Sequence, residues 1–501
     1  MKKVDTSSKE LLTGASIVMG GLFVSKLIGY IYTILIAKIG SETFGLYSLG
    51  ISIISFLVII SLFGFKSGIV RYISYYNTKK NDQKVKGIIK STLKISIPIS
   101  IFFSFLLFFF SSFIANNIFH NSDLSFLLKL FAFTIPLLVI TEIFFSVFTA
   151  FKKIKYKVIT NDFIEKISKL FLAFLLIYLG FKLESAIYSF VFSTVISFIF
   201  VIYFMNKSFP LFNNKLKSLE IKKELIYYSF PLLFSGVLSS VVKWIDTIMI
   251  GIFLNASEVG IYNVALSTSS LMILVPTAIM ALFLPLITEK YSKNDDKQIK
   301  KIYDRTVRWI FMFNISLFIF IAIFSREILN TMFGQEYVIG STSLLILIFG
   351  YFIFSFIHIH TGYLILIKKT RLILLVNFIM ALTNVILNLY LIPKYGIVGG
   401  AIATSVSLII AYLLSFFFSY KFSRINPYNV KISKILLFSF IIFIVISIFI
   451  KIKKFLSPIT LTKIIFLGII FLLVYGIILY FMLNKEDKLL FKELVLKKFK
   501  N

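Results

Sequence analysis

The sequence predicts an all-α integral membrane protein with about fourteen transmembrane helices. Of its 501 residues, 58% are hydrophobic and only 15% are charged, whereas a typical soluble domain has roughly 25% charged residues. Apolar runs long enough to cross ~30 Å of hydrocarbon recur along the whole chain. Backbone amides cannot stay unpaired in lipid, and the runs lack the alternation of a β-barrel, so helices are the structure that fits.

The apolar runs between polar breaks give the expected spans in order. The first half is expected to span near 11–37, 44–65, 88–115, 124–151, 158–180 and 184–206. The second half is expected to span near 224–254, 258–288, 307–325, 341–367, 372–392 and 397–420. Two more spans are expected near 435–450 and 461–483, and all connections are expected to be short. The first run lacks the pattern of a cleaved signal peptide, so we expect it to be retained.

The distribution of Lys and Arg predicts the orientation of these spans. Of 53 basic residues, 40 fall in the two termini and every second connection, eight fall in the other connections, and five lie within spans. Cytoplasmic loops carry the excess of basic residues, so both termini are expected on the cytoplasmic side of the plasma membrane.

An internal repeat is the most informative feature of the organisation. An offset of 215 residues places Gly45 on Gly260 and Tyr47 on Tyr262, and an offset of 215 to 216 holds as far as residue 402. Six spans per unit make the two halves a parallel repeat related by an axis along the membrane normal.

The repeat divides the chain into five expected segments. They are an N-terminal six-helix bundle (1–206), a cytoplasmic linker (207–223), a C-terminal six-helix bundle (224–422), two extra transmembrane helices (423–483) and a cytoplasmic tail (484–501). The tail has an apolar helical face and a basic side, which suits a helix lying on an anionic membrane surface. An ordinary solvated tail is the alternative.

Composition excludes several classes of function. The net charge of +31 comes from residues clustered between apolar runs, so it indicates topology and not nucleic-acid binding. Without cysteine the chain has no disulfide, thiolate metal site or cysteine nucleophile. His358 and His360 lie two residues apart, on roughly opposite sides of a helix, and His120 falls in an outer loop. No metal site and no cofactor are therefore expected.

Several stretches resemble one transporter family. They are SKLIGYIYTILIAKIGSETFGLYSLGIS and FGFKSGIVRYISYY within 25–76, SFPLLFSGVLSSVVKWIDTIMIGIFLNASEVGIYNVALS at 229–267, and NVILNLYLIPKYGIVGGAIATSVS at 384–407. The chain resembles the polysaccharide-transporter (oligosaccharide flippase) branch of the multidrug/oligosaccharidyl-lipid/polysaccharide exporter superfamily. The resemblance implies two six-helix bundles in a V around a cavity that opens alternately to each side, and two extra helices that form a groove for a polyprenyl tail. The peptidoglycan-precursor flippases carry additional arginines where this chain has Tyr32 and Thr247, which weakens an assignment to that substrate.

The leading hypothesis is a flippase or exporter, not an enzyme, that moves an isoprenoid-phosphate-linked oligosaccharide or polysaccharide precursor by alternating access. Its expected partners are this lipid-linked glycan, membrane lipids, a proton or sodium ion for coupling, and glycan-assembly proteins. Three alternatives stay open: a drug or organic-cation exporter of the same superfamily, a membrane glycosyltransferase or ligase, and a scaffold in an export complex. The basic centre and the short outer connections disfavour the first two.

Charged residues inside the spans are the candidate site residues, because a mid-span charge costs ~2.5–3.5 kcal/mol unless it faces water or a partner. Lys26 lies near the centre of the first span without an acidic residue in that span, and Lys243 lies near its repeat equivalent in the seventh. We expect both to bind the phosphate of the substrate. The alternative is that each neutralises a carboxylate, and for Lys243 that would be Asp246, one turn away.

A second charged group is expected in the fourth and fifth spans. Glu142, Glu165, Lys166 and Lys169 are predicted to form an internal ion-pair network in which Glu142 lies level with Lys169. Coupling of a proton or sodium ion through Glu142 or Asp246 is the alternative. In the eleventh span, one helical face carries three asparagines, which are expected to bond to neighbouring helices and not to a ligand: Asn377, Asn384 and Asn388.

Overall fold

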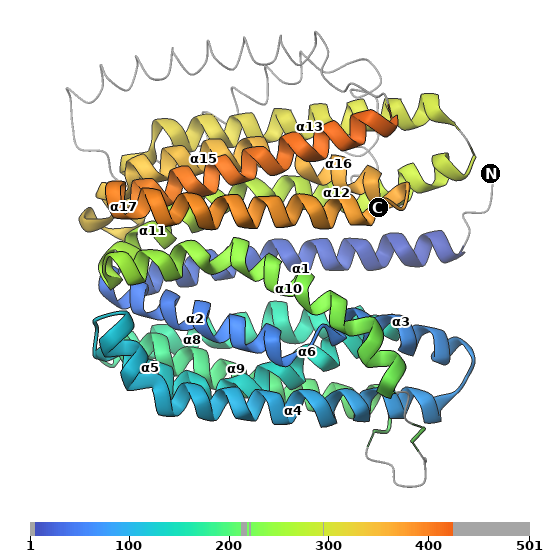
Figure 1. Cartoon of the computed structure of the whole chain (residues 1–501), viewed down its shortest axis with the longest axis horizontal. Helices are drawn as coiled ribbons and strands as arrows, with labels where there is room; N and C mark the ends of the chain where they lie inside the picture. The colour runs from blue at the N-terminus through green and yellow to red at the C-terminus, as the bar shows by residue number, and fades with distance from the viewer. Residues whose placement is uncertain (1–5, 212–217, 220–221, 294, 424–501) are drawn as a thin grey trace, which may run out of the picture.

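The computed structural model describes residues 6–211, 218–219, 222–293 and 295–423, and every regular element within them is a helix (Figure 1). The predicted spans near 435–450 and 461–483 and the predicted tail at 484–501 lie outside these residues. The expected total of fourteen transmembrane helices therefore stays a prediction.

The first half contains the following elements, with η1 and η2 being π-helical: α1 (Thr6–Ala37), α2 (Ser41–Ser61), α3 (Phe65–Thr78), α4 (Asp82–Phe113), η1 (Ile114–Ile118), α5 (Asp123–Ala132), α6 (Thr134–Ala150), α7 (Ile154–Lys157), η2 (Val158–Ile164), α8 (Glu165–Tyr178) and α9 (Leu183–Ser208).

The second half contains the following elements, with η4 being π-helical and η3 and η5 being 3-10 helices: α10 (Lys222–Phe253), α11 (Ala256–Ser269), η3 (Ser270–Ile273), α12 (Leu274–Ser292), α13 (Asp296–Ile323), α14 (Ser325–Ile328), η4 (Leu329–Phe333), η5 (Gln335–Gly340), α15 (Ser341–Phe354), α16 (Ile357–Leu366) and α17 (Thr370–Ser423).

Helical residues occupy every range that was predicted as a span between residues 11 and 420. Among the described residues, eight helices are long and apolar enough to cross a membrane, or nine if the bent pair α5 and α6 is counted as one span. The long helix α17 breaks at Gly396, whose φ of 57° and ψ of −140° are not helical. This break falls where the sequence predicted a boundary between two spans.

Residues 66–87, which the sequence analysis placed in a connection between two spans, contain an additional helix. This stretch contains most of α3, and α4 begins within it. The turn between them is fixed by Asn81, whose side chain accepts a hydrogen bond of 3.1 Å from the backbone N–H of Lys84. This is the usual way to satisfy the free amides of a helix N-terminus. The sequence analysis missed α3 because only one side of it is apolar, so it does not form a continuous apolar run.

The two halves lie on either side of α1 and α10, which run through the middle of the molecule (Figure 1). Helix α1 packs against α8 and η2 of the first half and also contacts α12 of the second. Helix α10 packs against α2 and α3 of the first half and against α17 and α11 of the second. Residues of both central helices therefore face the space between the halves.

At one end the halves are in close contact, where α2 crosses α11. A Cβ atom added to Gly45 would lie 1.7 Å from the carbonyl oxygen of Ala256, and one added to Gly260 would lie 1.9 Å from that of Ser41. Small residues allow helix backbones to approach this closely in membranes. Glu336 reinforces the contact by accepting hydrogen bonds of 2.9 Å from the backbone N–H and 2.8 Å from the hydroxyl of Ser41.

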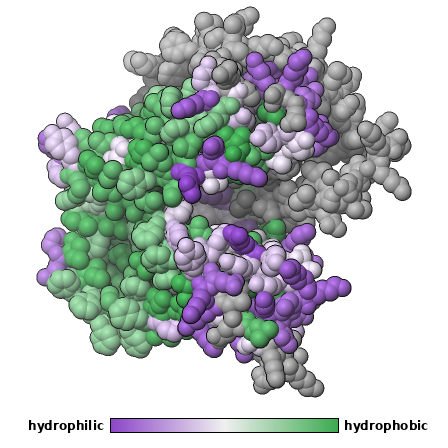
Figure 2. Space-filling view, turned by 45° about the vertical axis from the view of Figure 1, so that its right-hand side comes forward, coloured by the Kyte–Doolittle hydropathy of each residue, from purple (hydrophilic) through white to green (hydrophobic). Residues whose placement is uncertain are grey.

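Toward the other end the halves meet through α3 and α10, where a Cβ atom added to Gly64 would lie 2.2 Å from the carbonyl oxygen of Ser229. Figure 2 shows a broad hydrophobic belt, hydrophilic side chains gathered beyond it, and a hollow between the upper and lower parts of the molecule. Large apolar side chains lie exposed on several helices, for example Phe109 at 73% and Phe171 at 63% exposure. Such a belt is the surface that a lipid bilayer would cover.

Candidate functional site

Three lysines from three helices gather between the halves, and we call them the lysine cluster: Lys26 on α1, Lys166 on α8 and Lys243 on α10. The charge of Lys243 is affected by the nearby charges of Lys26, Lys166 and Lys66. Lys26 and Lys243 are both exposed, and the charge of Lys166 acts on each of them. Like charges that lie close together repel one another, and a bound anion would relieve this repulsion. The cluster is therefore suited to receive an anion.

Neither Lys26 nor Lys243 forms an ion pair within 4.0 Å in the part of the chain that the structure describes. Lys243 instead lies 4.5 Å from the centre of the Trp244 ring. The alternative in which Asp246 neutralises Lys243 is therefore wrong. Asp246 is buried at 3% exposure, so its carboxylate and the exposed ammonium of Lys243 have different environments.

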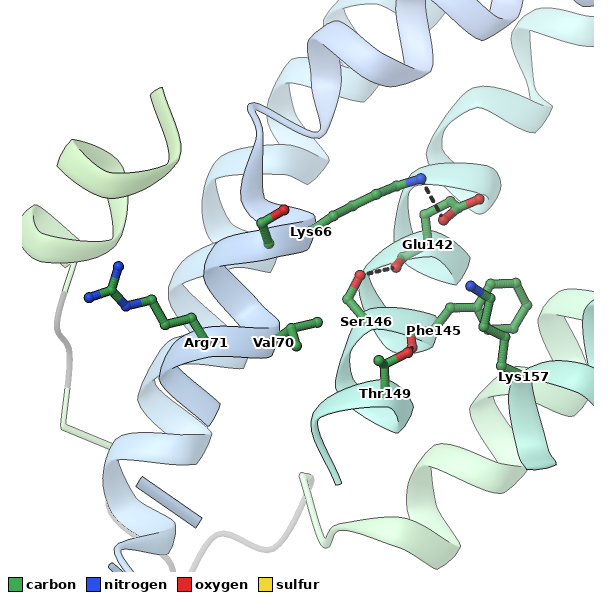
Figure 3. Close-up of a pocket in the computed structure, with 9 residues that line it drawn as sticks. Lys66, Val70, Arg71, Glu142, Phe145, Ser146, Thr149 and Lys157 are labelled. Carbon is green, nitrogen blue, oxygen red and sulfur yellow. Dashed lines mark hydrogen bonds and ion pairs between the residues drawn. The ribbon is translucent and has the colours of Figure 1, made fainter. Parts of the chain in front are cut away.

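A pocket of about 410 Å³ lies beside the cluster, between α3 and α6. Figure 3 shows Lys66 reaching from α3 to Glu142 on α6, and their charged atoms are 2.8 Å apart. Lys157 and Arg71 also line this pocket. Sequence analysis assigned these basic residues to a connection and missed them. The signal was available, because FKSGIVRY places Lys66 and Arg71 on an otherwise half-apolar helix.

Arg71 joins this pocket to the second half of the molecule. Its guanidinium lies 4.5 Å from the centre of the Tyr228 ring on α10. A hydrogen bond to the Tyr228 hydroxyl raises the pKa of Arg71 above its ordinary value. The guanidinium therefore stays charged at every physiological pH.

The ion-pair network predicted for the fourth and fifth spans is wrong, because the carboxylates pair with other lysines than predicted. Glu142 pairs with Lys66 and not with Lys169, because α3 folds back onto α6. Glu165 lies 3.5 Å from Lys166 and makes no ion pair with Lys169 in the described residues. Helical spacing alone could not show which neighbouring helix each side chain faces.

Lys169 lies instead in an aromatic enclosure of the first half. It is 9% exposed and donates a short hydrogen bond to the hydroxyl of Tyr47. Its ammonium lies 4.3 Å from the centre of the Tyr32 ring and 5.1 Å from that of Phe190. Aromatic faces attract cations, and more strongly where water is excluded.

Asp246 is the centre of a buried polar cluster in the second half. One carboxylate oxygen accepts hydrogen bonds of 3.0 Å from the Asn384 amide and 2.5 Å from the Asn388 amide. The other accepts one of 2.9 Å from the Tyr262 hydroxyl and a short one from the Thr404 hydroxyl. All four donors are neutral, so the negative charge has hydrogen bonds but no cationic side chain within 4.0 Å in the described residues.

The amide oxygens of Asn384 and Asn388 are buried and have no hydrogen-bond partner. The expectation that these two asparagines bond to a neighbouring helix is confirmed, since both reach Asp246 on α10. Asn377 lies on the same helix but is only half-buried. A carboxylate beside two free amide oxygens and a hydroxyl offers a set of oxygen ligands of the kind that hard cations prefer.

The two histidines of α16 have different surroundings. His360 is buried, and its Nδ1 lies 2.5 Å from the hydroxyl of Tyr303 and 2.8 Å from that of Ser419. These contacts join α16 to α13 and α17, so His360 links helices within the second half. Within the described residues, no group of three or more His, Cys, Asp or Glu side chains could hold a metal ion.

Comparison with protein families gives two matches. The model of a family described as polysaccharide biosynthesis protein matches residues 11–290. The model of the MatE family matches residues 231–390. The two matches together span residues 11–390.

Among curated proteins, the chain is 31% identical over 255 residues to a protein of Haloferax volcanii named as a low-salt glycan biosynthesis flippase. That alignment covers 50% of this chain and 53% of the relative, so the chain matches about half of that relative's length. It is 22% identical to a protein of Shigella flexneri named as an O-antigen transporter, over 75% of this chain and 89% of the relative.

Two solved structures share the fold. The lipid II flippase MurJ in an inward closed conformation superposes with a TM-score of 0.73 at 21% identity, covering 93% of this chain and 99% of that one. A multidrug resistance MATE transporter in an inward-facing conformation gives a TM-score of 0.68 at 13% identity, covering 82% of this chain and 95% of that one. These similarities show the fold, which is an all-α fold with several helices long and apolar enough to cross a membrane.

Proposed function

Because the chain belongs to the family of polysaccharide biosynthesis proteins, we propose that it moves a lipid-linked glycan precursor across the cytoplasmic membrane by alternating access. In this proposal it is a transporter and not an enzyme. Its partners are the lipid-linked glycan and the membrane lipids, and glycan-assembly proteins are candidates for protein partners.

The observation that carries this proposal is the lysine cluster, to which both halves of the molecule contribute. The cluster offers charge-assisted hydrogen bonds to a phosphate group, and Lys26 and Lys243 approach it from different halves. The glycan and its phosphate would enter the hollow, while the lipid tail stays in the bilayer. The contact of α2 with α11 would close one side until the halves rock apart.

We further propose that the halves are a parallel repeat of two six-helix bundles, with fourteen transmembrane helices in all. Backbone features recur at the offset found in the sequence. The π-helical turns η1 and η4 begin at Ile114 and Leu329. Lys152 and Lys368 both have a φ of 59°, and Gly180 and Gly396 both have positive φ. Such features depend on local geometry, so their recurrence supports the two bundles at 1–206 and 224–422, joined by 207–223.

The proposed orientation can be tested with reporters fused in the connections. Fusions after Lys80 and Lys293 should read cytoplasmic, and fusions after Asn121 and Lys182 should read external, because basic connections stay on the cytoplasmic side. The measurement is a pair of reporters, one active only inside and one only outside, at each position. The same reading at Lys80 and Asn121 would contradict the assignment of α4 as a spanning helix.

The coupling ion is proposed to act at Asp246. A buried carboxylate that has only neutral partners can take up a proton, or it can bind sodium together with the free amide oxygens of Asn384 and Asn388. The earlier alternative, Glu142, is less suited because Lys66 already neutralises it.

Replacing Asp246 with asparagine should remove the dependence of transport on an ion gradient, because asparagine keeps the approximate shape but carries no charge. In vesicles, an imposed sodium or proton gradient should accelerate glycan-lipid translocation by the unmodified protein but not by Asp246→Asn. Glu289→Gln, which alters an exposed carboxylate paired with Lys293, is the matched control and should keep the response. An unchanged gradient response in Asp246→Asn would exclude Asp246 as the coupling site.

A drug or organic-cation exporter is the alternative within the same fold. A cation would have to approach Lys26, Lys166 and Lys243, whose charges repel it. The lysine cluster therefore favours an anionic substrate.

A further inference from the structure

A second, smaller cavity lies between the halves, and we call it the inter-half pocket. Its volume is about 230 Å³. It begins at Ile28, two residues beyond Lys26 along α1, and it reaches Phe44 and Ser48 near the close contact of α2 with α11. It is lined from both halves by Ile28, Gly29, Tyr32, Thr33, Phe44, Tyr47, Ser48, Ile51, Lys166, Lys169, Trp244, Asn263 and Ser267.

The charged residues of this lining are both cationic. Lys169 is nine-tenths buried, and no carboxylate lies within 4.0 Å of it in the described residues. An ammonium group has three N–H donors, and one of them goes to the hydroxyl of Tyr47. Lys166 lies 3.5 Å from Glu165, which does not line the pocket. The pocket therefore presents positive charge without a matching negative charge in its wall.

The rest of the lining combines aromatic faces with small polar groups. Trp244 comes from α10 of the second half, and its ring is half-buried. Thr33, Ser48 and Ser267 bring hydroxyl groups to the same space. Apolar and aromatic walls with a few placed polar groups are typical of small-molecule sites. The volume is below the ~300–1,000 Å³ of sites for drug-sized ligands, so the pocket has room for one small ring.

We propose that the inter-half pocket binds a single sugar ring that carries a carboxylate, such as a uronic acid, within the glycan that the protein moves. The carboxylate would contact Lys169 and Lys166, and the ring would lie against Trp244. This proposal rests on the proposed function, because in a lipid-linked glycan the first sugars are attached next to the phosphate, and the lysine cluster lies next to the pocket.

Trp244 allows the pocket to be tested directly. The chain has two tryptophans, so a protein with Trp309→Phe reports on Trp244 alone. The purified, full-length protein in detergent is titrated with methyl glucuronide, methyl glucoside and inorganic phosphate. We expect methyl glucuronide to change the Trp244 fluorescence with saturation, and methyl glucoside to bind at least tenfold more weakly. Phosphate is expected at the lysine cluster, so its binding should not depend on Lys169. Equal binding of methyl glucoside, or displacement of methyl glucuronide by phosphate at equal concentration, would overturn the assignment of a carboxylated sugar to the pocket.

Variants separate the ligand role of Lys169 from a structural one. Lys169→Met should weaken the binding of methyl glucuronide at least tenfold, and Lys169→Arg should retain part of it because the charge is kept. Lys182→Met, at an exposed lysine of the α8–α9 connection, is the control and should bind normally. Unchanged binding of methyl glucuronide by Lys169→Met would overturn the proposal, since Lys169 would then contact its aromatic neighbours and not the ligand. If the unmodified protein flips the lipid-linked glycan in vesicles but does not bind methyl glucuronide, the subsite alone is rejected. If it binds methyl glucuronide but does not flip the lipid-linked glycan, the transport function alone is rejected.

Discussion

Replacing Lys26 with alanine or glutamate abolishes translocation of the lipid-linked glycan in our proposal, whereas arginine retains a measurable part of it. Lys26 has no ion-pair partner in the described residues and faces two further lysines of the cluster. A hydrogen bond to a charged group contributes about 1.5–3 kcal/mol, so its loss should weaken binding of the substrate roughly 10- to 150-fold. Glutamate adds repulsion, while arginine keeps the charge with a different geometry.

The measurement is the amount of lipid-linked oligosaccharide accessible on each face of reconstituted vesicles, normalised to folded protein. Lys38→Ala is the matched control, because Lys38 is an exposed lysine just after the same helix. It should transport normally. Transport at the unmodified rate by Lys26→Ala would show that Lys26 does not bind phosphate. If Lys26→Arg folds normally but fails as completely as Lys26→Glu, the site depends on shape and not on charge.

Replacing Gly260 with leucine should prevent the halves from closing where α2 crosses α11. Even a Cβ atom would lie 1.9 Å from the carbonyl oxygen of Ser41, and backbone cannot move aside as a flexible side chain can. Overpacking of this kind typically destabilises the folded state by about 1–3 kcal/mol, and occasionally by more. We expect Gly260→Leu to insert in the membrane, to remain open at this end and to lose translocation, because alternating access requires both ends to close in turn.

A disulfide between introduced cysteines provides the readout. The hydroxyl oxygens of Ser41 and Ser257 lie 2.6 Å apart, and the chain has no cysteine of its own. Oxidation of Ser41→Cys with Ser257→Cys should join the halves and stop transport until a reductant is added. Adding Gly260→Leu should prevent the cross-link, whereas Gly236→Ala, where a Cβ meets only an ordinary contact, should not. Transport that continues while the disulfide is intact would contradict opening at this end.

The sequence indicated which charged residues are candidates for the site, but not which residues they contact. Lys26 and Lys243 were singled out because a charge within an apolar run is costly, and that cost depends only on composition. The partner of Glu142 could not be found this way. Lys66 reaches it because α3 folds back onto α6, and α3 leaves little trace in a search for long apolar runs. Arg71 on the same helix was counted as a topology signal, and so was Lys157 on α7, whereas the structure shows that both line a pocket.

Asp246 illustrates the same limit. Its sequence neighbour Lys243 suggested an ion pair, but its hydrogen-bond donors come from α11 and α17, up to 158 residues away. The asparagines of α17 were expected to bond to a neighbouring helix because amides in a membrane need partners. Which helix and which residue they reach follows from packing.

The sequence by itself determined the helical membrane fold, and every range that it predicted as a span between residues 11 and 420 is occupied by helix, because the length and polarity of a segment decide whether it can cross a bilayer. The tertiary structure decided which charges meet. Side chains such as Lys169, Tyr47 and Tyr32 come from separate helices, and their contacts depend on how each helix is rotated and where it crosses its neighbours. Close approach of α2 to α11 at Gly45 and Gly260 fixes one such crossing, because neither glycine has a side chain to hold the two backbones apart.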